Sequence, residues 1–591
     1  MKPVLRAATV ATTLAVSYGM IASTPATAGD AVTSRASLTA AHGTGPLANP
    51  TVPGTLRDRP DRVASVLANQ ARGGAPDRAD ASVAPGAAKP VGTTVRGPAA
   101  RPAVATAVKA APYDINGDGY RDVVIGAPGE NLGPDTDAGM FHVFYGRSTG
   151  LTGSGSIVIH QDTPGVPGSP EDYDQFGYAN TSGDFNADGY ADVAVSANTE
   201  TLGSVVDAGL VLVFYGSATG LRTDNVLSLG IARWELFFGN ALTSGDFNGD
   251  GHDDLAVGGP WHDGGPGLDS GSTFVFNGGA SGLSTAYQEF YQGGGTVPGV
   301  AGQYDSFGAA LSAGDVNGDG STDLVVGAFL DWEDLGWPIG SATVLYGSAA
   351  GLNSNADGQR FSKQTPGVPG SGGSFNDTTD DPDGFGFQVA LSDFTGDGKA
   401  DLAVGAPGSP VSVDGVRKRD AGTVTVLYSD GTRIGTVNAV QVTQQTAGMP
   451  GTAGYEDYFG WTLAAGDVNG DGRSELAIFS PGDTYVTVVP GGSSGLVYAN
   501  ARGWTQNSSG IPGSSESGDW WGNSLRFADI KGTGYASLVV GADGENSYRG
   551  AFTVIHSTGT GLTGTGAQAF SQDSPGVPGT AEAGDSFGVF F

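Results

Sequence analysis

A nine-residue stretch recurs seven times in this chain and constrains its fold more than any other feature. The copy at Asp315–Asp323 reads Asp-Val-Asn-Gly-Asp-Gly-Ser-Thr-Asp, with oxygen-bearing side chains at positions 1, 3, 5 and 9 and glycine at position 6. Alternating carboxylates and amides on a short loop turn inward around a hard cation, and the glycine takes a turn with positive φ. Successive copies begin 70, 62, 69, 78, 74 and 62 residues apart. The pattern predicts a repeat protein whose unit carries a cation-binding loop.

The same short runs surround each loop. Six loops have an aromatic–glycine pair eight residues upstream, as in Phe307-Gly308, and a β-branched run follows directly, as in Leu324–Ala328. An alternating run closed by an aromatic residue and glycine comes next, as in Ala138–Gly146, and most repeats are separated by a turn such as Gln161–Gly168. Each unit therefore predicts about four short strands. Four strands at this period are typical of an enlarged propeller blade, and seven blades close a ring.

The first repeat lacks the aromatic–glycine pair upstream of Asp114, whereas an additional pair, Phe587-Gly588, follows the last repeat. We predict that this C-terminal strand supplies the missing first strand of the first blade, because such closure removes an exposed sheet edge. The alternative is that Val104–Ala111 forms that strand itself.

The order of phenylalanine–glycine pair, cation loop and Val-Ile-Gly-Ala-Pro run, the last at Val124–Pro128, resembles the FG-GAP repeat. That family forms the seven-bladed propeller of integrin α-subunit head domains and of many exported bacterial proteins. The resemblance covers about residues 111–591 and implies an all-β, seven-bladed propeller of four-stranded blades. Nothing in the sequence matches the partner chain or the separate ligand-binding domain of integrins, so integrin-type recognition is not implied.

The twelfth position of each loop distinguishes it from an EF-hand. An EF-hand has a bidentate glutamate there, followed by a helix, whereas Val326 and its counterparts are β-branched and begin a strand. The ninth residue must therefore supply the closing carboxylate. Ligands that are all oxygen favour Ca²⁺ over zinc or copper, and Mg²⁺ rarely accepts an all-protein cage.

Six loops have a complete ligand set, formed by side chains at positions 1, 3, 5 and 9 and the backbone carbonyl at position 7. The sets are Asp114, Asn116, Asp118, Tyr120 and Asp122; Asp184, Asn186, Asp188, Tyr190 and Asp192; Asp246, Asn248, Asp250, His252 and Asp254; Asp315, Asn317, Asp319, Ser321 and Asp323; Asp393, Thr395, Asp397, Lys399 and Asp401; and Asp467, Asn469, Asp471, Arg473 and Glu475. The alternative is a metal-free Asx/Gly turn, in which three carboxylates would repel one another. We expect about six calcium ions, which stabilise the blades and take no part in catalysis.

The seventh loop, Asp529–Ser537, is degenerate. Lys531, Thr533 and Ser537 replace the ligands at positions 3, 5 and 9. We expect this loop to keep its turn without an ion, with Lys531 partly replacing the missing charge. We expect the fifth site to be weaker than the others, because Thr395 replaces asparagine.

The residues that precede the repeats have a different composition. Lys2 and Arg6, an apolar run from Ala7 to about Ala22 and Ala26-Thr27-Ala28 predict a signal peptide over residues 1–28, although an N-terminal membrane anchor is the alternative. Residues 29–110 are rich in Ala, Pro and Gly and predict a flexible, mildly basic arm. We expect a secreted, extracellular protein with no further membrane span.

Composition narrows the range of partners and chemistry. The net charge of −33 argues against nucleic acid as a partner, and the absence of cysteine excludes disulfides and thiolate chemistry. The six histidines are scattered, and Gly491–Gly495 matches a G-x-S-x-G spacing only at a position where other repeats have a turn.

Two functions remain at this stage. The first is a calcium-stabilised module that binds a protein or glycan ligand, as in adhesion; the second is an exported hydrolase or lyase with its site at the propeller channel. Trp261, Trp332 and Trp337 lie in loops between strands and suggest an aromatic recognition surface, or else packing against a neighbouring blade. Of the adjacent Trp520 and Trp521, Trp521 occupies the aromatic–glycine position and is expected in the core. The oligomeric state stays open, and a monomer is compatible with the sequence.

Overall fold

The computed structural model describes residues 109–263, 269–332, 338–370 and 382–590. All of them belong to one of the two compact units of the chain, which comprises Ala81–Asn376 and Asp380–Phe591. The predicted signal peptide and nearly all of the predicted arm lie outside the described residues.

The described residues form eight antiparallel sheets: seven blades, which we number 1 to 7 in chain order, and one two-stranded hairpin. Blade 1 contains β1 (Val123–Ala127), β2 (Met140–Phe144) and β3 (Ile157–Ile159). Blade 2 contains β4 (Phe176–Gly183), β5 (Asp192–Ala197), β6 (Leu210–Phe214) and β7 (Leu227–Gly230). Blade 3 contains β8 (Leu242–Gly245), β9 (Asp254–Gly259), β10 (Ser272–Phe276) and β11 (Tyr287–Phe290). Blade 4 contains β12 (Ala310–Gly314), β13 (Asp323–Ala328), β14 (Ser341–Leu345) and β15 (Gln359–Phe361).

The remaining blades repeat this order. Blade 5 contains β16 (Val389–Ser392), β17 (Asp401–Ala406), β20 (Thr423–Leu427) and β21 (Val440–Val442), with the hairpin β18 (Val411–Val413) and β19 (Val416–Lys418) between its second and third strands. Blade 6 contains β22 (Thr462–Gly466), β23 (Glu475–Ser480), β24 (Tyr485–Val489) and β25 (Arg502–Trp504), with the 3₁₀ helix η2 (Tyr498–Asn500). Blade 7 contains β26 (Leu525–Ala528), β27 (Ser537–Ala542), β28 (Ala551–Ser557) and β29 (Leu562–Phe570), with the short helix α3 (Glu545–Tyr548).

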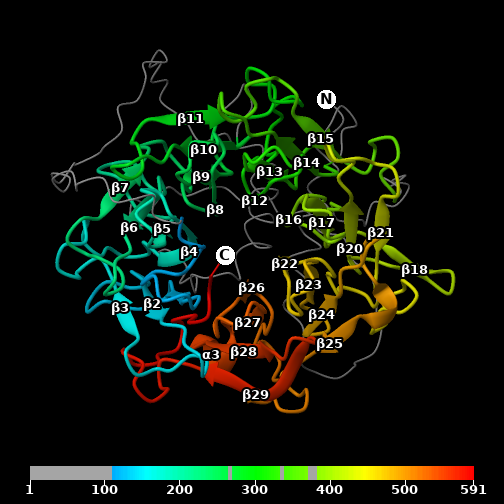
Figure 1. Ribbon diagram of the computed structural model, residues 1–591. Helices are drawn as coiled ribbons and strands as arrows, with labels where there is room; N and C mark the ends of the chain where they lie inside the picture. Colours follow the sequence, from blue (N-terminus) through cyan, green and yellow to red (C-terminus); the bar gives the residue numbers. More distant parts are fainter. Residues whose placement is uncertain (1–108, 264–268, 333–337, 371–381, 591) are drawn as a thin grey trace, which may run out of the picture. The chain divides into compact units, whose positions relative to one another are not determined.

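The blades form a ring, as the sequence predicts. The first strands β4, β8, β12, β16, β22 and β26 lie innermost and contact one another in succession, while β7, β11 and the other fourth strands lie outermost (Figure 1). Most second and third strands, such as β6 and β13, are buried along their whole length, because each is covered on both faces by a neighbouring blade. Continuous β-branched and apolar runs suit such doubly covered strands.

The aromatic–glycine pairs and the Gly-Ala runs fit together across the blade boundaries. Phe307 is fully buried, and a Cβ placed on Gly258 of blade 3 would lie 2.0 Å from the carbonyl oxygen of Gly308 in blade 4. The same approach joins Gly327 to the carbonyl oxygen of Gly386, at 2.1 Å. Only glycine permits this distance. The glycine at the end of the β-branched run in one blade therefore contacts the glycine of the aromatic–glycine pair in the next blade.

Phe587-Gly588 completes blade 1, which confirms the prediction of C-terminal closure. Gly588 N–H donates to the carbonyl of Gly126 at 3.1 Å, and Gly126 N–H donates to the carbonyl of Val589 at 2.6 Å. Phe587 is fully buried and packs 5.8 Å from the ring of Phe552 in blade 7. The pairing with β1 is a single bridge rather than a full strand.

Arg526 and Tyr113 lie beside this partial strand. Arg526 of β26 donates to the side-chain oxygen of Asn180 in β4 at 3.0 Å and to the carbonyl of Phe590 at 3.2 Å. Its guanidinium lies 4.4 Å from the ring centre of Tyr113 and 5.1 Å from that of Phe590. A side chain of blade 7 thus reaches blade 2 across the gap that the incomplete first strand of blade 1 leaves.

Candidate metal centres

The predicted cation loops occupy equivalent positions in the blades, because each precedes the second strand. Asp184–Asp192, for example, joins β4 to β5. In each of the six loops with a complete ligand set, the first aspartate accepts a hydrogen bond from the N–H of the glycine at position 6, at 2.7–3.1 Å. The aspartate at position 5 accepts one from the N–H at position 7. These bonds turn the side chains at positions 1 and 5 inward along the loop.

The ninth residue lies deeper than the others. In the second loop, the two carboxylate oxygens of Asp192 accept the N–H groups of Gly216 at 2.9 Å and Phe185 at 3.0 Å, and its side chain is fully buried. Burial, followed by the charges of Asp118 and Asp114, raises the pKa of Asp122 to about 8. Burial, followed by the charges of Asp315 and Asp319, raises the pKa of Asp323 to about 7. A cation beside these buried carboxylates would favour their charged form.

The side-chain oxygens at positions 1, 3, 5 and 9, with the carbonyl at position 7, form a donor set that suits calcium. Within the described part of the chain, no three Asp, Glu, His or Cys side chains are already gathered into a closed metal cluster. The carboxylates instead bind the amides of their own loop, so side-chain rotation toward an ion is required for full coordination. The ligand assignment therefore stays a prediction.

A feature that the sequence did not reveal is a closed chain of backbone hydrogen bonds between loops. The N–H at position 8 of each loop donates to the carbonyl at position 1 of the preceding loop. The seven donors are Ala191, Asp253, Thr322, Ala400, Ser474, Ala536 and Arg121, and the distances are 2.7–3.1 Å. Because the last bond runs from Arg121 to Asp529, the degenerate loop is also part of the chain. Backbone hydrogen bonds do not depend on residue type, so the sequence indicated these contacts only through the regular recurrence of the loops.

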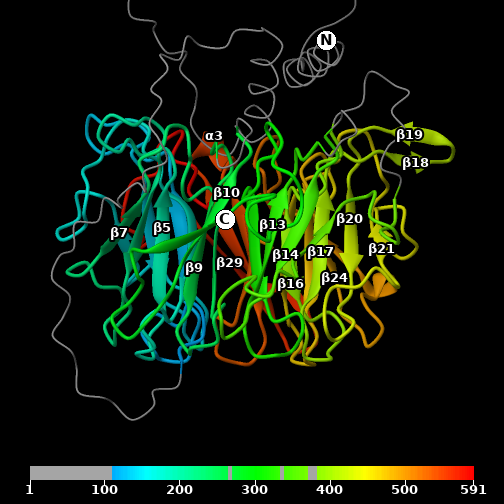
Figure 2. The ribbon, with the colours of Figure 1, turned by 90° about the horizontal axis from the view of Figure 1, so that it is seen from above.

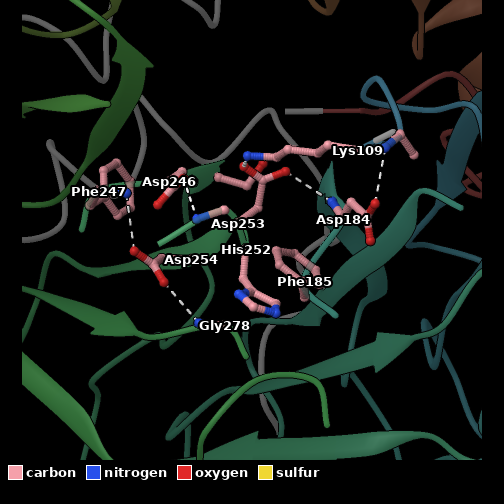
Figure 3. Close-up of polar contacts among 12 residues, drawn as sticks. Lys109, Asp184, Phe185, Asp246, Phe247, His252, Asp253, Asp254 and Gly278 are labelled. Carbon is pink, nitrogen blue, oxygen red and sulfur yellow. Dashed lines mark hydrogen bonds and ion pairs between the residues drawn. The ribbon is translucent and has the colours of Figure 1, made fainter. Parts of the chain in front are cut away.

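Additional side chains tie the second loop to its surroundings (Figure 3). Lys109 Nζ lies 2.7 Å from Asp253 Oδ1, and Asp253 Oδ2 accepts the N–H of Asp184 at 2.9 Å. Asp184 Oδ2 accepts the N–H of Ala110 at 2.9 Å. The sequence indicates this contact only through Asp253, because the third loop alone has an acidic residue at position 8.

The degenerate seventh loop keeps the turn, as predicted. Asp529 accepts the N–H of Gly534 at 2.7 Å and that of Thr533 at 2.9 Å. Ser537, at the ninth position, lies 3.2 Å from His556 Nδ1 rather than offering a carboxylate. A serine–histidine contact thus occupies the place of the buried carboxylate.

The proposed aromatic recognition surface is only partly accessible. Trp521 is in the core, as expected, and donates to Thr553 Oγ1 at 3.2 Å. Trp337 lies outside the described residues, and Trp261 and Trp332 are partly buried. The most exposed tryptophan described is Trp234, at 62%, which the sequence did not single out.

The ring of blades, the glycine contacts between them and the loop before each second strand define a β-propeller built from FG-GAP repeats. Six segments of the chain match FG-GAP repeats, and its propeller is integrin-α-like. The family model described as FG-GAP repeat matches residues 107–144, 176–214, 238–276, 307–328, 385–427 and 459–499. Blade 7, with the degenerate loop, lies outside these ranges.

Relatives share limited segments with this chain. Integrin alpha-PS5 of Drosophila melanogaster is 34% identical over 154 residues, which are 26% of this chain and 15% of the relative. Phosphatidylinositol-glycan-specific phospholipase D of Rattus norvegicus is 33% identical over 153 residues, 26% of this chain and 18% of the relative. Integrin alpha-5 of Xenopus laevis is 28% identical over 227 residues, 37% of this chain and 20% of the relative. The chain thus spans about a fifth or less of the length of these relatives.

Among solved structures, Bacillus licheniformis rhamnogalacturonan lyase PL11 aligns with a TM-score of 0.29 and 12% identity over 72% of this chain and 80% of the lyase. That superposition is too loose to bear on fold or function. In the described part of the chain, no helix has the length and apolarity to cross a bilayer.

Proposed function

We propose that the protein is a secreted, calcium-stabilised propeller that binds a protein or carbohydrate ligand, as an adhesion module does. The observation that carries the calcium part is the closed chain of hydrogen bonds between loops. Each ion would neutralise a buried ninth carboxylate at the start of a second strand and stiffen a loop that is bonded to both neighbours. Calcium would therefore stabilise the ring as a whole, and the loops at the opposite end of the blades would be free to contact a ligand.

The relatives support a binding role through the part that they share with this chain. Two of them are integrin α chains, and six segments of this chain match FG-GAP repeats. The match covers only 18% of the relative named as a phospholipase D. The activity in its name therefore belongs to a protein of which most lies outside the match.

The first test measures the melting temperature of the full chain with calcium and with a chelator. We expect chelation to lower the melting temperature, because the buried carboxylates would lose their counter-ion. An unchanged melting temperature would refute the calcium part of the proposal.

The second test compares binding and turnover. The full chain is applied to glycan and extracellular-protein arrays with and without calcium, beside ester, glycoside and phosphodiester substrates. We expect calcium-dependent retention of a ligand and no turnover. Turnover of any substrate that is independent of calcium would overturn the binding assignment.

A further inference from the structure

A polar cluster lies between blades 1 and 2, at the other end of the strands from the cation loops. It contains Gln161 after β3, Asp174 before β4 and Glu200 after β5, all of them less than 10% exposed. Gln161 Nε2 donates to Glu200 Oε2 at 2.8 Å, and the carboxyl groups of Asp174 and Glu200 are in hydrogen-bonding contact. We call this arrangement a junction cluster. Two buried carboxyl groups in contact repel each other unless a proton or a cation lies between them.

The same cluster recurs at the two preceding junctions. Its members are Gln506, Asp519 and Glu545 between blades 6 and 7, and Gln572, Asp585 and Glu130 between blades 7 and 1; all are less than 10% exposed except Glu545, which is partly buried. Each glutamine donates to the glutamate at 2.7 Å. Glu545 begins α3, which Figure 2 shows at one end of the blades together with β18 and β19.

Each of these three clusters has a third carboxylate close by. Glu171, Glu516 and Glu582 stand three residues before the aspartate, and their N–H groups donate to it. Their own side chains are exposed, so each is free to turn over the buried pair. The glutamine also has a buried Oε1 with no hydrogen-bond partner in the protein, at Gln161, Gln506 and Gln572, as it does at Gln292 and Gln444 in two other junctions.

Three other junctions contain a cation supplied by the protein. Between blades 4 and 5, Lys363 replaces the glutamine, its Nζ lies 3.1 Å from Asp383, and Ser409 replaces the glutamate. Between blades 3 and 4, Arg360 Nε donates to Asp331 at 3.0 Å. Between blades 5 and 6, the charge of Lys418 acts on Asp457. At these last two junctions aspartate stands in place of glutamate, and the residue three before the buried aspartate is glycine.

The junction between blades 2 and 3 has lost the buried pair. Ile231 and Leu236 stand where the glutamine and the aspartate would be, and both belong to an apolar core cluster. His262 replaces the glutamate and lies 3.2 Å from Glu289. The chain therefore shows three arrangements: an apolar junction, junctions with a built-in cation, and three consecutive junctions with glutamine, aspartate and two glutamates.

We propose that the three junctions with glutamine, aspartate and two glutamates are sites for a divalent cation of the calcium class, separate from the cation loops. The donors are hard oxygens only: three carboxylates and the unpartnered amide oxygen. The ion takes the role that Lys363 and Arg360 have at other junctions. It neutralises the two buried carboxyl groups, which otherwise repel each other.

The test counts calcium ions bound to the full chain at pH 7.5 by equilibrium dialysis. The triple variant Asp174→Asn, Asp519→Asn and Asp585→Asn removes one carboxylate from each site with little change in shape. We expect it to bind three calcium ions fewer than the unchanged chain. An unchanged count overturns the proposal. Variants of the loops, such as Asp323→Asn, address the loop sites separately, so the two assignments fail independently.

A matched variant guards against loss of folding. Gln161→Lys with Glu200→Ser copies the junction between blades 4 and 5, and should bind one ion fewer while it keeps its melting temperature in chelator. Terbium luminescence gives a local reading, because Trp520 directly follows Asp519. Excitation of tryptophan should sensitise terbium in the unchanged chain and much less in Asp519→Asn. Equal luminescence in the two proteins, or a full ion count in the lysine variant, contradicts the proposal.

Discussion

At the scale of single residues, the ninth loop position has opposite requirements with and without an ion. Asp323 is fully buried and accepts the N–H groups of Val316 at 2.8 Å and Gly347 at 2.7 Å. In the proposed calcium-bound state its charge would be a ligand, whereas without calcium the same charge is buried near Asp315 and Asp319. A substitution at this position should therefore affect the melting temperature differently with and without calcium.

Asp323→Asn should lower the melting temperature in calcium and leave it equal or higher in chelator, because asparagine removes a ligand and also a buried charge. Thermal unfolding in both conditions checks this. Ser537→Ala, in the degenerate loop, is the control and should leave the difference between the two conditions unchanged. A loss of equal size in both conditions would contradict a role in calcium binding.

His142 gives a pH prediction that is independent of the metal. It is fully buried against Phe587, neither ring nitrogen has a partner, and burial lowers its pKa from 6.5 to about 3. The unfolded chain binds this proton more readily, so the stability contribution is present above pH 6.5 and is lost as the pH falls toward 3. The loss over that range should approach about 4 kcal/mol.

The variant His142→Leu should remove this part of the pH dependence. Denaturant unfolding of both proteins at several pH values between 7 and 3.5 checks the difference in the free energy of unfolding. Parallel curves for the two proteins would show that the histidine does not titrate as its burial implies.

At the scale of elements, the glycine contacts between blades explain the two glycines of the repeat. Gly327→Ala should destabilise the protein by about 2–3 kcal/mol, because its Cβ would lie 2.1 Å from the carbonyl oxygen of Gly386. Gly279→Ala is a matched control, since its Cβ would meet nothing closer than 3.9 Å. Comparison of the two midpoints in denaturant decides the matter, and equal midpoints would contradict the close approach.

The elements themselves were largely predictable from the sequence. Runs such as Leu324–Ala328 are strands because both faces are buried, and their apolar character is continuous. The loops were predictable because oxygen-bearing residues alternate around an obligatory glycine. The junction clusters were not, because Gln161 and Glu200 are 39 residues apart and the turn that begins at Gln161 does not indicate its partner. Among the described residues, no other repeat has a sheet like the hairpin β18–β19, so it could not be inferred from them.

At the scale of the whole molecule, Arg526 joins three distant parts of the chain: Tyr113, Asn180 in β4 and Phe590. Arg526→Met should keep much of the packing but remove the side-chain donor to the carbonyl of Phe590 and leave the side-chain oxygen of Asn180 with the Tyr113 hydroxyl alone. We expect a loss of about 2–4 kcal/mol in the free energy of unfolding. Arg502→Met, at an exposed position of β25, is the control. Chemical denaturation checks both, and equal stability of the two variants would argue against a role of Arg526 in closure.

The closure of blade 1 has a consequence for the order of events during synthesis. Six blades consist of strands that are close together in the chain, whereas blade 1 pairs β1 with Gly588 and Val589. The ribosome must therefore release almost the whole chain before the ring can close, and the edge of β1 stays open until then. A chain interrupted before Phe587 would keep that edge available for pairing with other molecules. The ring of this propeller can therefore close only after its C-terminal segment has been made, and the earlier blades form an open arc until then.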